Sequence, residues 1–187
     1  MKNLPVMLIV VGCVAIGNVD AEVITSNGFT LHSTELGGQL THAQVFSGFG
    51  CSGANISPAL EWADAPEGTE SFAGTMYDPD APTGSGWWHW LIFDISADTS
   101  ALKSDAGNPD RGLAPKDSIQ STTDFSAKGF GGACPPEGAR PHSYIFTVYA
   151  LDIGKLELDE NSPPAMVGFF LNQHALAKAS LIAYYNR

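Results

Sequence analysis

The sequence predicts a mainly antiparallel β domain with a few helices. Strand signals recur through the first three quarters of the 187-residue chain, either as apolar–polar alternation or as short apolar runs bounded by turn residues. Helical periodicity is clear only once, near the C-terminal end. Glycine and proline are frequent, with 20 and 12 residues, and they divide the chain into short segments as turns do. Together these features favour sheet layers over a helical bundle.

The expected strands span residues 23–25, 44–46, 56–62, 71–77, 88–95 and 143–151. Residues 88–95 form a nearly continuous apolar run, so this strand is expected to be buried on both faces. Residues 98–128 carry many turn formers and few apolar side chains, which predicts long loops with brief strand pairing. Residues 143–151 form the clearest strand.

The pattern predicts one helix, over about residues 163–179. Ser162 can cap it, and Pro163 suits the first helical position. Apolar residues then recur at three- and four-residue steps from Met166 to Leu176.

The charge balance excludes one class of partner. Nine Lys and Arg residues stand against 20 Asp and Glu residues, which gives a formal net charge of -11. The resulting field repels phosphate backbones and anionic membrane surfaces, so nucleic acid is not expected as a partner. No repeat, low-complexity tract or linker divides residues 22–187, and this length suits a single domain.

Residues 1–21 are predicted to be a cleavable secretory signal peptide. Lys2 gives a positive start, an interrupted apolar stretch follows, and Ala21 ends a run of small residues suited to cleavage. The stretch falls short of the about 18 unbroken apolar residues typical of a spanning helix, so the mature form is expected to have no membrane span. An uncleaved anchor and lipoprotein processing at Cys13 are the two alternatives. Export would place the protein in the periplasm or outside the cell.

Cleavage would leave Cys51 and Cys134 in the mature chain. An even pair in a compartment that permits disulfides is expected to be bonded, and two separately buried thiols are the alternative. A bond closing so long a loop would stabilise the fold by about 4–5 kcal/mol at most.

The first segment with potential binding chemistry is residues 77–90. A strand ends at Asp78, the chain turns through prolines and glycines beside Asp80, and the next strand begins with tryptophans around His89. Asp78 could orient and charge a histidine, whereas a turn-capping role explains Asp80 better. Taken alone, His89 fits an ordinary strand position, and the tryptophans fit a core.

The second segment is residues 129–144. A Gly-rich loop exposes backbone N–H groups, prolines fix its exit, and His142 and Tyr144 begin the longest strand. Because imidazole has an unperturbed pKa near 6.5, a neighbouring carboxylate can keep it partly protonated. Two such rings would form a cationic niche in an acidic protein. Together with the glycine amides, this niche could bind a phosphate. The tryptophans would then contact any apolar part of the ligand.

The two segments share a family pattern. The run Asp-Pro-Asp-Ala-Pro at 78–82 is followed by Trp-His-Trp at 88–90, and Gly-Gly-Ala-Cys-Pro-Pro at 131–136 is followed by His142 and Tyr144. In this order the motifs resemble the phosphatidylethanolamine-binding protein family, especially its bacterial, Raf-kinase-inhibitor-like branch. The resemblance extends over nearly the whole mature chain.

The resemblance implies a large antiparallel sheet packed on a smaller sheet, with a few peripheral helices and a small anion pocket at one end. Family members bind phosphate-like groups there, including phospholipid headgroups. The matching residues in this chain are Asp78, His89, Pro135, His142 and Tyr144. Secondary candidates near the pocket are Asp80, Trp88, Gly132 and Arg140.

The chain departs from the family pattern at Ser143. Family members often carry Arg between the positions of His142 and Tyr144, and Arg140 could substitute for it from the loop. The kinase-regulating role of eukaryotic relatives is not expected here, because an exported protein has no evident access to a cytosolic kinase.

The sequence therefore predicts an exported, non-enzymatic protein that binds a small anionic ligand without a cofactor, with His89 and His142 as donors. One alternative is a secreted inhibitor or interaction module that docks a partner protein through the pocket. Another is a metal-dependent or acid–base hydrolase built on two His and two Asp. The chain lacks the His-x-x-x-His spacing, the Gly-x-Ser-x-Gly elbow and the Gly-x-x-x-x-Gly-Lys loop of common hydrolytic and phosphoryl-transfer sites.

Overall fold

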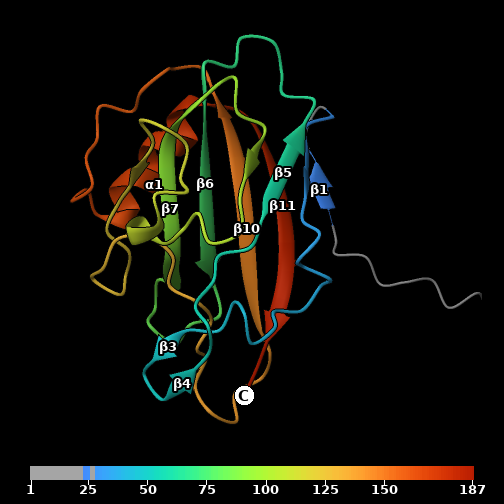
Figure 1. Ribbon diagram of the computed structural model, residues 1–187, viewed down its shortest axis with the longest axis vertical. Helices are drawn as coiled ribbons and strands as arrows, with labels where there is room; N and C mark the ends of the chain where they lie inside the picture. Colours follow the sequence, from blue (N-terminus) through green and yellow to red (C-terminus); the bar gives the residue numbers. More distant parts are fainter. Residues whose placement is uncertain (1–22, 26–27) are drawn as a thin grey trace, which may run out of the picture.

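The computed structural model describes residues 23–25 and 28–187, and in this part the chain forms a large sheet, a smaller sheet, a short hairpin and one α-helix (Figure 1). The predicted signal peptide over residues 1–21, including Cys13, lies outside the described residues. Within the described part, no helix has the length and apolar character needed to cross a bilayer.

The large sheet has the strand order β1-β11-β10-β6-β7-β9, and every neighbouring pair is antiparallel. Its strands are β1 (Val23–Thr25), β11 (Ala175–Tyr185), β10 (His142–Leu151), β6 (Ser71–Asp78), β7 (Trp87–Ser96) and β9 (Ile119–Gln120). The long central strands β10 and β6 bring the two candidate segments of the sequence to the same end of the sheet.

The smaller sheet has the order β2-β5-β8, with β2 at Thr30–His32, β5 at Leu60–Ala63 and β8 at Ala101–Leu102. A separate hairpin joins β3 (Ser47–Gly48) and β4 (Cys51–Ser52) at the end of the molecule where the chain also ends (Figure 1). A short 3-10 helix, η1, spans Pro109–Arg111. The predicted fold class, a large antiparallel sheet with a smaller sheet and little helix, is confirmed.

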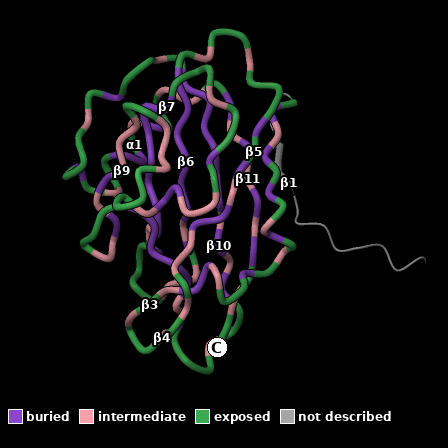
Figure 2. Tube along the Cα trace, in the orientation of Figure 1, coloured by how far each residue is buried: buried purple, intermediate pink, exposed green. Residues whose placement is uncertain are grey.

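Both faces of the large sheet are covered. On one face, Trp90 and Phe146 pack in a buried cluster with Leu31 and Leu60 of the smaller sheet. The other face packs against helix α1 (Pro164–His174). Figure 2 shows buried residues concentrated in the middle of the large sheet and exposed residues in the surrounding loops. Since each fully buried large apolar side chain contributes about 1.5–3 kcal/mol, these strands are a rigid support for residues at their ends.

The predicted helix is wrong beyond His174. The next eleven residues form β11, in which Ala177, Ala179 and Leu181 alternate toward the core with exposed or half-buried neighbours. Alanine has the highest intrinsic helix propensity, but pairing with β10 along almost the whole strand overrides it.

The predicted start of the helix is also wrong by one residue. Pro163 is the N-cap and Pro164 the first helical residue, and no side chain caps the helix. The Ser162 hydroxyl instead accepts a hydrogen bond from the backbone N–H of Asp159.

The other strand predictions have mixed outcomes. The strands expected at 23–25, 71–77, 88–95 and 143–151 are confirmed, with ends shifted by no more than one residue. The strand expected at 44–46 is wrong, because there only Val45 pairs, in an isolated bridge with Ala133. Of residues 56–62, only the last three are in a strand. The region 98–128 does consist of loops with brief pairing.

Candidate ligand-binding site

A cavity of about 200 Å³ lies at the end of the large sheet where β6 ends and where β7 and β10 begin. Five residues that the sequence predicts for the pocket line this cavity: Asp78, His89, Pro135, His142 and Tyr144. They come from three neighbouring strands and from the loop before β10. Segments more than 50 residues apart therefore meet at one point, as the resemblance implies.

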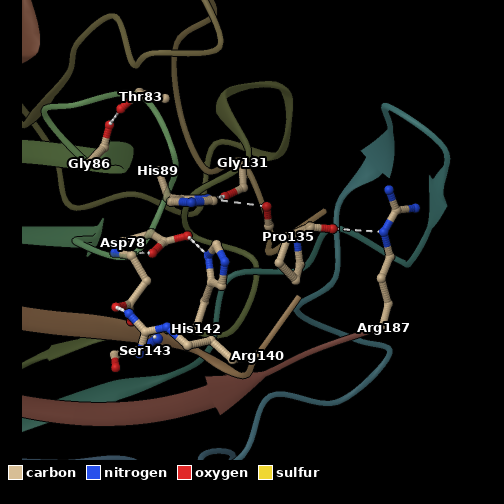
Figure 3. Close-up of polar contacts among 12 residues, drawn as sticks. Asp78, Thr83, Gly86, His89, Gly131, Pro135, Arg140, His142, Ser143 and Arg187 are labelled. Atoms are coloured by element: carbon tan, nitrogen blue, oxygen red, sulfur yellow. Dashed lines mark hydrogen bonds and ion pairs between the residues drawn. The ribbon is translucent and has the colours of Figure 1, made fainter. Parts of the chain in front are cut away.

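Asp78 and His142 form a buried polar contact in the wall of the cavity. His142 Nδ1 lies 2.8 Å from Asp78 Oδ2, and their side chains are 5% and 3% exposed (Figure 3). The other carboxylate oxygen of Asp78 accepts the backbone N–H of Asp80 at 2.8 Å, an Asx turn that fixes the carboxylate at the strand end. An ionised carboxylate only accepts, so Nδ1 of His142 is the donor and its Nε2 is left for the cavity.

His89 occupies a bulge in β7. Trp90 pairs with Met76 and Trp88 with Tyr77, so His89 is an extra residue between two paired positions. Its Nδ1 donates to the carbonyl oxygen of Gly131 at 2.8 Å, with a longer contact of 3.2 Å to that of Gly132. The bulge and the two carbonyls together fix the direction of the ring.

The expectation that His89 and His142 are both positively charged is wrong for His89. Burial lowers the pKa of His89 to about 4, and this effect exceeds the opposing influence of the carbonyls and of the Asp78 and Asp124 charges. At neutral pH the ring is uncharged, and because Nδ1 carries the proton, Nε2 presents a lone pair. His89 is therefore an acceptor at this pH.

Two buried donors in the cavity wall have no partner. Within the described part of the chain, neither the Tyr144 hydroxyl nor the Trp87 indole N–H has a partner at good hydrogen-bond geometry, and the Asp78 carboxylate is the side chain that acts on the Tyr144 hydroxyl from nearby. Burial, helped by the nearby Asp78 charge, raises the pKa of Tyr144, so its hydroxyl stays protonated. A buried donor without a partner costs about 1–3 kcal/mol, and such groups commonly serve a ligand.

Sequence reasoning missed Trp87 because it treated the tryptophans as core residues. Alternate residues of a strand share a face, so Trp87 belongs with His89 and Trp88 with the opposite face. Trp88, a secondary candidate, indeed lies away from the cavity and packs on the Tyr77 ring at 4.6 Å and near Gly168.

An aromatic rim borders the cavity. Phe49 is 70% exposed at the turn of the β3–β4 hairpin, and Phe125 stacks on Phe46 with ring centroids 4.5 Å apart. The Phe125 ring also meets the edge of His89 at 5.3 Å. A second cavity of about 410 Å³ shares Phe49 and Phe125 with the first, so the rim continues as an apolar surface. No local sequence signal identified these phenylalanines.

The predicted disulfide between Cys51 and Cys134 is present, with Cα atoms 6.0 Å apart. It ties the hairpin to the loop that carries Pro135. Arg187 adds a second link, because its guanidinium donates to the carbonyl of Pro135 at 2.7 Å (Figure 3). It also donates to the carbonyl of Gly50 at 2.9 Å. The hairpin is thus fixed to the cavity wall.

The other secondary candidates support the site from outside. Asp80 accepts the backbone N–H of Ser143 at 2.8 Å and pairs with Arg140 at 2.6 Å. The Ser143 N–H is the main reason that the pKa of Asp80 is lowered. Arg140 is mostly exposed and does not line the cavity, so the expectation that it replaces the family Arg inside the pocket is wrong.

The expectation that glycine amides face the ligand is also wrong. The Gly131 N–H donates to the His89 carbonyl at 2.8 Å, and the Gly132 N–H donates to the Asn55 side chain at 2.7 Å. Gly132 instead permits close backbone packing, since a Cβ there would lie 2.3 Å from the carbonyl oxygen of Gln44. Among residues 28–187, no three His, Cys, Asp or Glu side chains converge as a metal site.

Comparison with known proteins places this geometry in a family. The family model described as "Phosphatidylethanolamine-binding protein" matches residues 32–186. UPF0098 protein YbcL of Escherichia coli K12 is 51% identical over 156 residues, which cover 83% of this chain and 85% of YbcL. UPF0098 protein YbhB of the same organism is 50% identical over 152 residues, or 80% of this chain and 94% of YbhB.

Solved structures agree with the sequence comparisons. The crystal structure of E. coli YbcL, described as a new member of the mammalian PEBP family, matches with a TM-score of 0.83 and 50% identity, covering 85% of this chain and 98% of its own. CT736 from Chlamydia trachomatis matches with a TM-score of 0.70 and 26% identity, covering 87% and 99% of the two chains. Since the family model spans most of the sequence and two relatives are 51% and 50% identical to it over 83% and 80% of its length, this chain belongs to the phosphatidylethanolamine-binding protein family.

Proposed function

We propose that this protein is an exported, non-enzymatic binding protein whose cavity holds a small oxyanion, such as phosphate or the phosphate of a headgroup. The observation that carries the proposal is the pair of buried, unpartnered donors, Tyr144 Oη and Trp87 Nε1, in the wall of one cavity. Both groups are donors, and the oxygens of an oxyanion are the acceptors that they lack.

His142 supplies a further group. The hydrogen bond from Nδ1 to Asp78 orients the ring, so that Nε2 becomes a third donor whenever the imidazole is protonated. Among the described residues, no Lys or Arg side chain lines the cavity. The site therefore depends on hydrogen bonds from the buried side chains in its wall, where each bond is stronger than in water.

The size of the cavity limits the ligand. Pockets for drug-sized molecules occupy roughly 300–1,000 Å³, whereas this cavity has about 200 Å³. It suits a phosphate with a short substituent, and the exposed Phe49 at the rim would contact a longer apolar group. Docking of a protein partner on the same exposed rim is the alternative function.

Export rests on the predicted leader and on the disulfide. The Cys51–Cys134 bond is of the kind that persists in oxidising compartments and is rare in the cytosol. Mass analysis of the mature protein and its cell fraction would test this part, because an intact N-terminus in the cytosolic fraction would contradict it.

Titration calorimetry with inorganic phosphate and phosphoethanolamine tests the binding function. We expect Tyr144→Phe and Trp87→Phe each to weaken binding at least fivefold, because each removes one donor to the oxyanion. Tyr149→Phe in the same strand as Tyr144, and Trp88→Phe beside Trp87, are matched controls on the opposite face of the sheet. Absence of binding by the wild type, or equal losses in the controls, would contradict the proposal.

A further inference from the structure

The cavity combines hydrogen-bond donors with a fixed acceptor. Tyr144 Oη and Trp87 Nε1 are donors without partners, whereas His89 Nε2 carries a lone pair. The orientation of His89 follows from geometry, since both atoms that Nδ1 contacts are carbonyl oxygens and can only accept. A ring flip would bring a lone pair against these carbonyls and would lose both contacts.

The environment keeps His89 in this uncharged form. The ring is 3% exposed and lies edge-on to Phe125 and Tyr144, each with ring centroids 5.3 Å away. The charged groups that act on it are Asp78 and Asp124, and both favour protonation. Desolvation outweighs them and leaves the pKa at about 4.

An oxyanion without a hydrogen of its own cannot satisfy the acceptor in the cavity wall. Every oxygen of sulfate is an acceptor, so an oxygen placed against His89 Nε2 would meet another lone pair, and neither atom would be satisfied. Hydrogen phosphate has the same tetrahedral shape but carries a hydroxyl group that can donate to Nε2. The neutral form of His142 offers a second acceptor of the same kind.

We propose that the cavity selects tetrahedral oxyanions that bring their own donor hydrogen, such as hydrogen phosphate, and that His89 is the residue that enforces this selection. The inference rests on the proposed oxyanion site and assigns its ligand class. A phosphate diester has no hydroxyl group, so a phospholipid headgroup would satisfy His89 only through another donor, such as its ammonium group.

Phosphate and sulfate at pH 8 form the matched pair of ligands, because both are then mainly dianions and differ in one hydrogen. Titration calorimetry of the wild type is expected to give at least tenfold tighter binding of phosphate. Equal binding would overturn the selection while leaving the oxyanion site intact. Binding of neither ion would contradict the oxyanion site itself. Phosphoethanolamine and dimethyl phosphate, measured in parallel, separate a headgroup donor from a free phosphate hydroxyl.

His89→Asn is the decisive variant. The Asn amide can still donate to the Gly131 carbonyl but lacks an equivalent of Nε2, so phosphate affinity should fall and the phosphate-to-sulfate ratio should approach one. His174→Asn changes a half-buried histidine that pairs with Asp152 away from the cavity, and this control should keep the ratio. A merely structural role of His89 would weaken both ions equally and would overturn the assignment. If the variant does not fold, the wild-type ratio alone decides.

Discussion

Asp78 and His142 are hydrogen-bonded at 2.8 Å with both side chains almost completely buried, and they join the end of β6 to the start of β10. The same chain holds an exposed counterpart, Asp152 with His174 at 2.9 Å, whose side chains are 51% and 32% exposed. The two hydrogen bonds have almost the same length but differ in solvent exposure. Comparing them therefore separates the effect of burial on stability from the effect of the hydrogen bond itself.

Asp78→Ala is expected to destabilise the protein by about 1–3 kcal/mol, because it leaves the buried Nδ1–H donor of His142 without its acceptor. Asp78→Asn should cost less, since the amide oxygen can still accept from Nδ1. Urea denaturation followed by circular dichroism measures both. Asp152→Ala is the control and should cost no more than about 1 kcal/mol, as for surface ion pairs. Equal losses in the free energy of unfolding for Asp78→Ala and Asp152→Ala would show that burial of the Asp78–His142 pair does not increase its contribution to stability.

The sequence predicted much of this site because its strongest signals are local. Asp78 and His142 stand at the ends of strands with clear patterns, and those strands proved to be neighbours in the sheet. The resemblance to a family supplied what local patterns lack, namely that these strand ends meet. Period-two alternation would also have identified Trp87, had it been applied to the run of tryptophans.

Other features depend on long-range packing and could not be predicted. The alanine-rich residues of β11 have helix propensity, and only the partner strand β10 makes them a strand. The neutral state of His89 follows from burial, which outweighs the opposing effect of carbonyls more than 40 residues away. Phe49 reaches the rim only because the disulfide and Arg187 hold its hairpin there.

His89 should make stability depend on pH in a defined window. Its folded-state pKa is about 4 against 6.5 in the unfolded chain, so below pH 6.5 the unfolded state binds a proton that the folded state does not. Stability should therefore be complete above pH 6.5 and decrease as the pH falls toward 4, by about 3 kcal/mol for this group. Urea titrations from pH 4 to 7 measure the slope, which should be smaller in His89→Asn. An unchanged slope would contradict the neutral assignment.

The disulfide should matter for both stability and binding. Cys51 and Cys134 are 83 residues apart, and loop closure over this distance gives an upper value of about 4–5 kcal/mol. The double variant Cys51→Ser with Cys134→Ser should unfold at lower urea concentration and bind phosphate more weakly, because Cys134 lines the cavity beside Pro135. Wild-type protein treated with a reductant should behave in the same way. Unchanged phosphate affinity would show that the hairpin does not shape the cavity.

Gly132 tests how far the loop backbone positions His89. A Cβ at this residue would lie 2.3 Å from the Gln44 carbonyl oxygen and 2.6 Å from the Phe46 nitrogen, and backbone atoms cannot move aside as a flexible side chain can. Gly132→Ala should therefore shift the loop and cost about 1–3 kcal/mol or more. Gly37→Ala is the matched control, because a Cβ there meets nothing within 4 Å and stability should change little. Since the Gly131 and Gly132 carbonyls hold the His89 ring in its buried position, the displaced loop should also admit water beside the ring. Burial is the main cause of the lowered pKa of His89, so reduced burial should make the His89 ring signals in NMR spectra titrate above pH 4. A stable variant with unchanged ring signals would show that the loop backbone does not keep the ring desolvated.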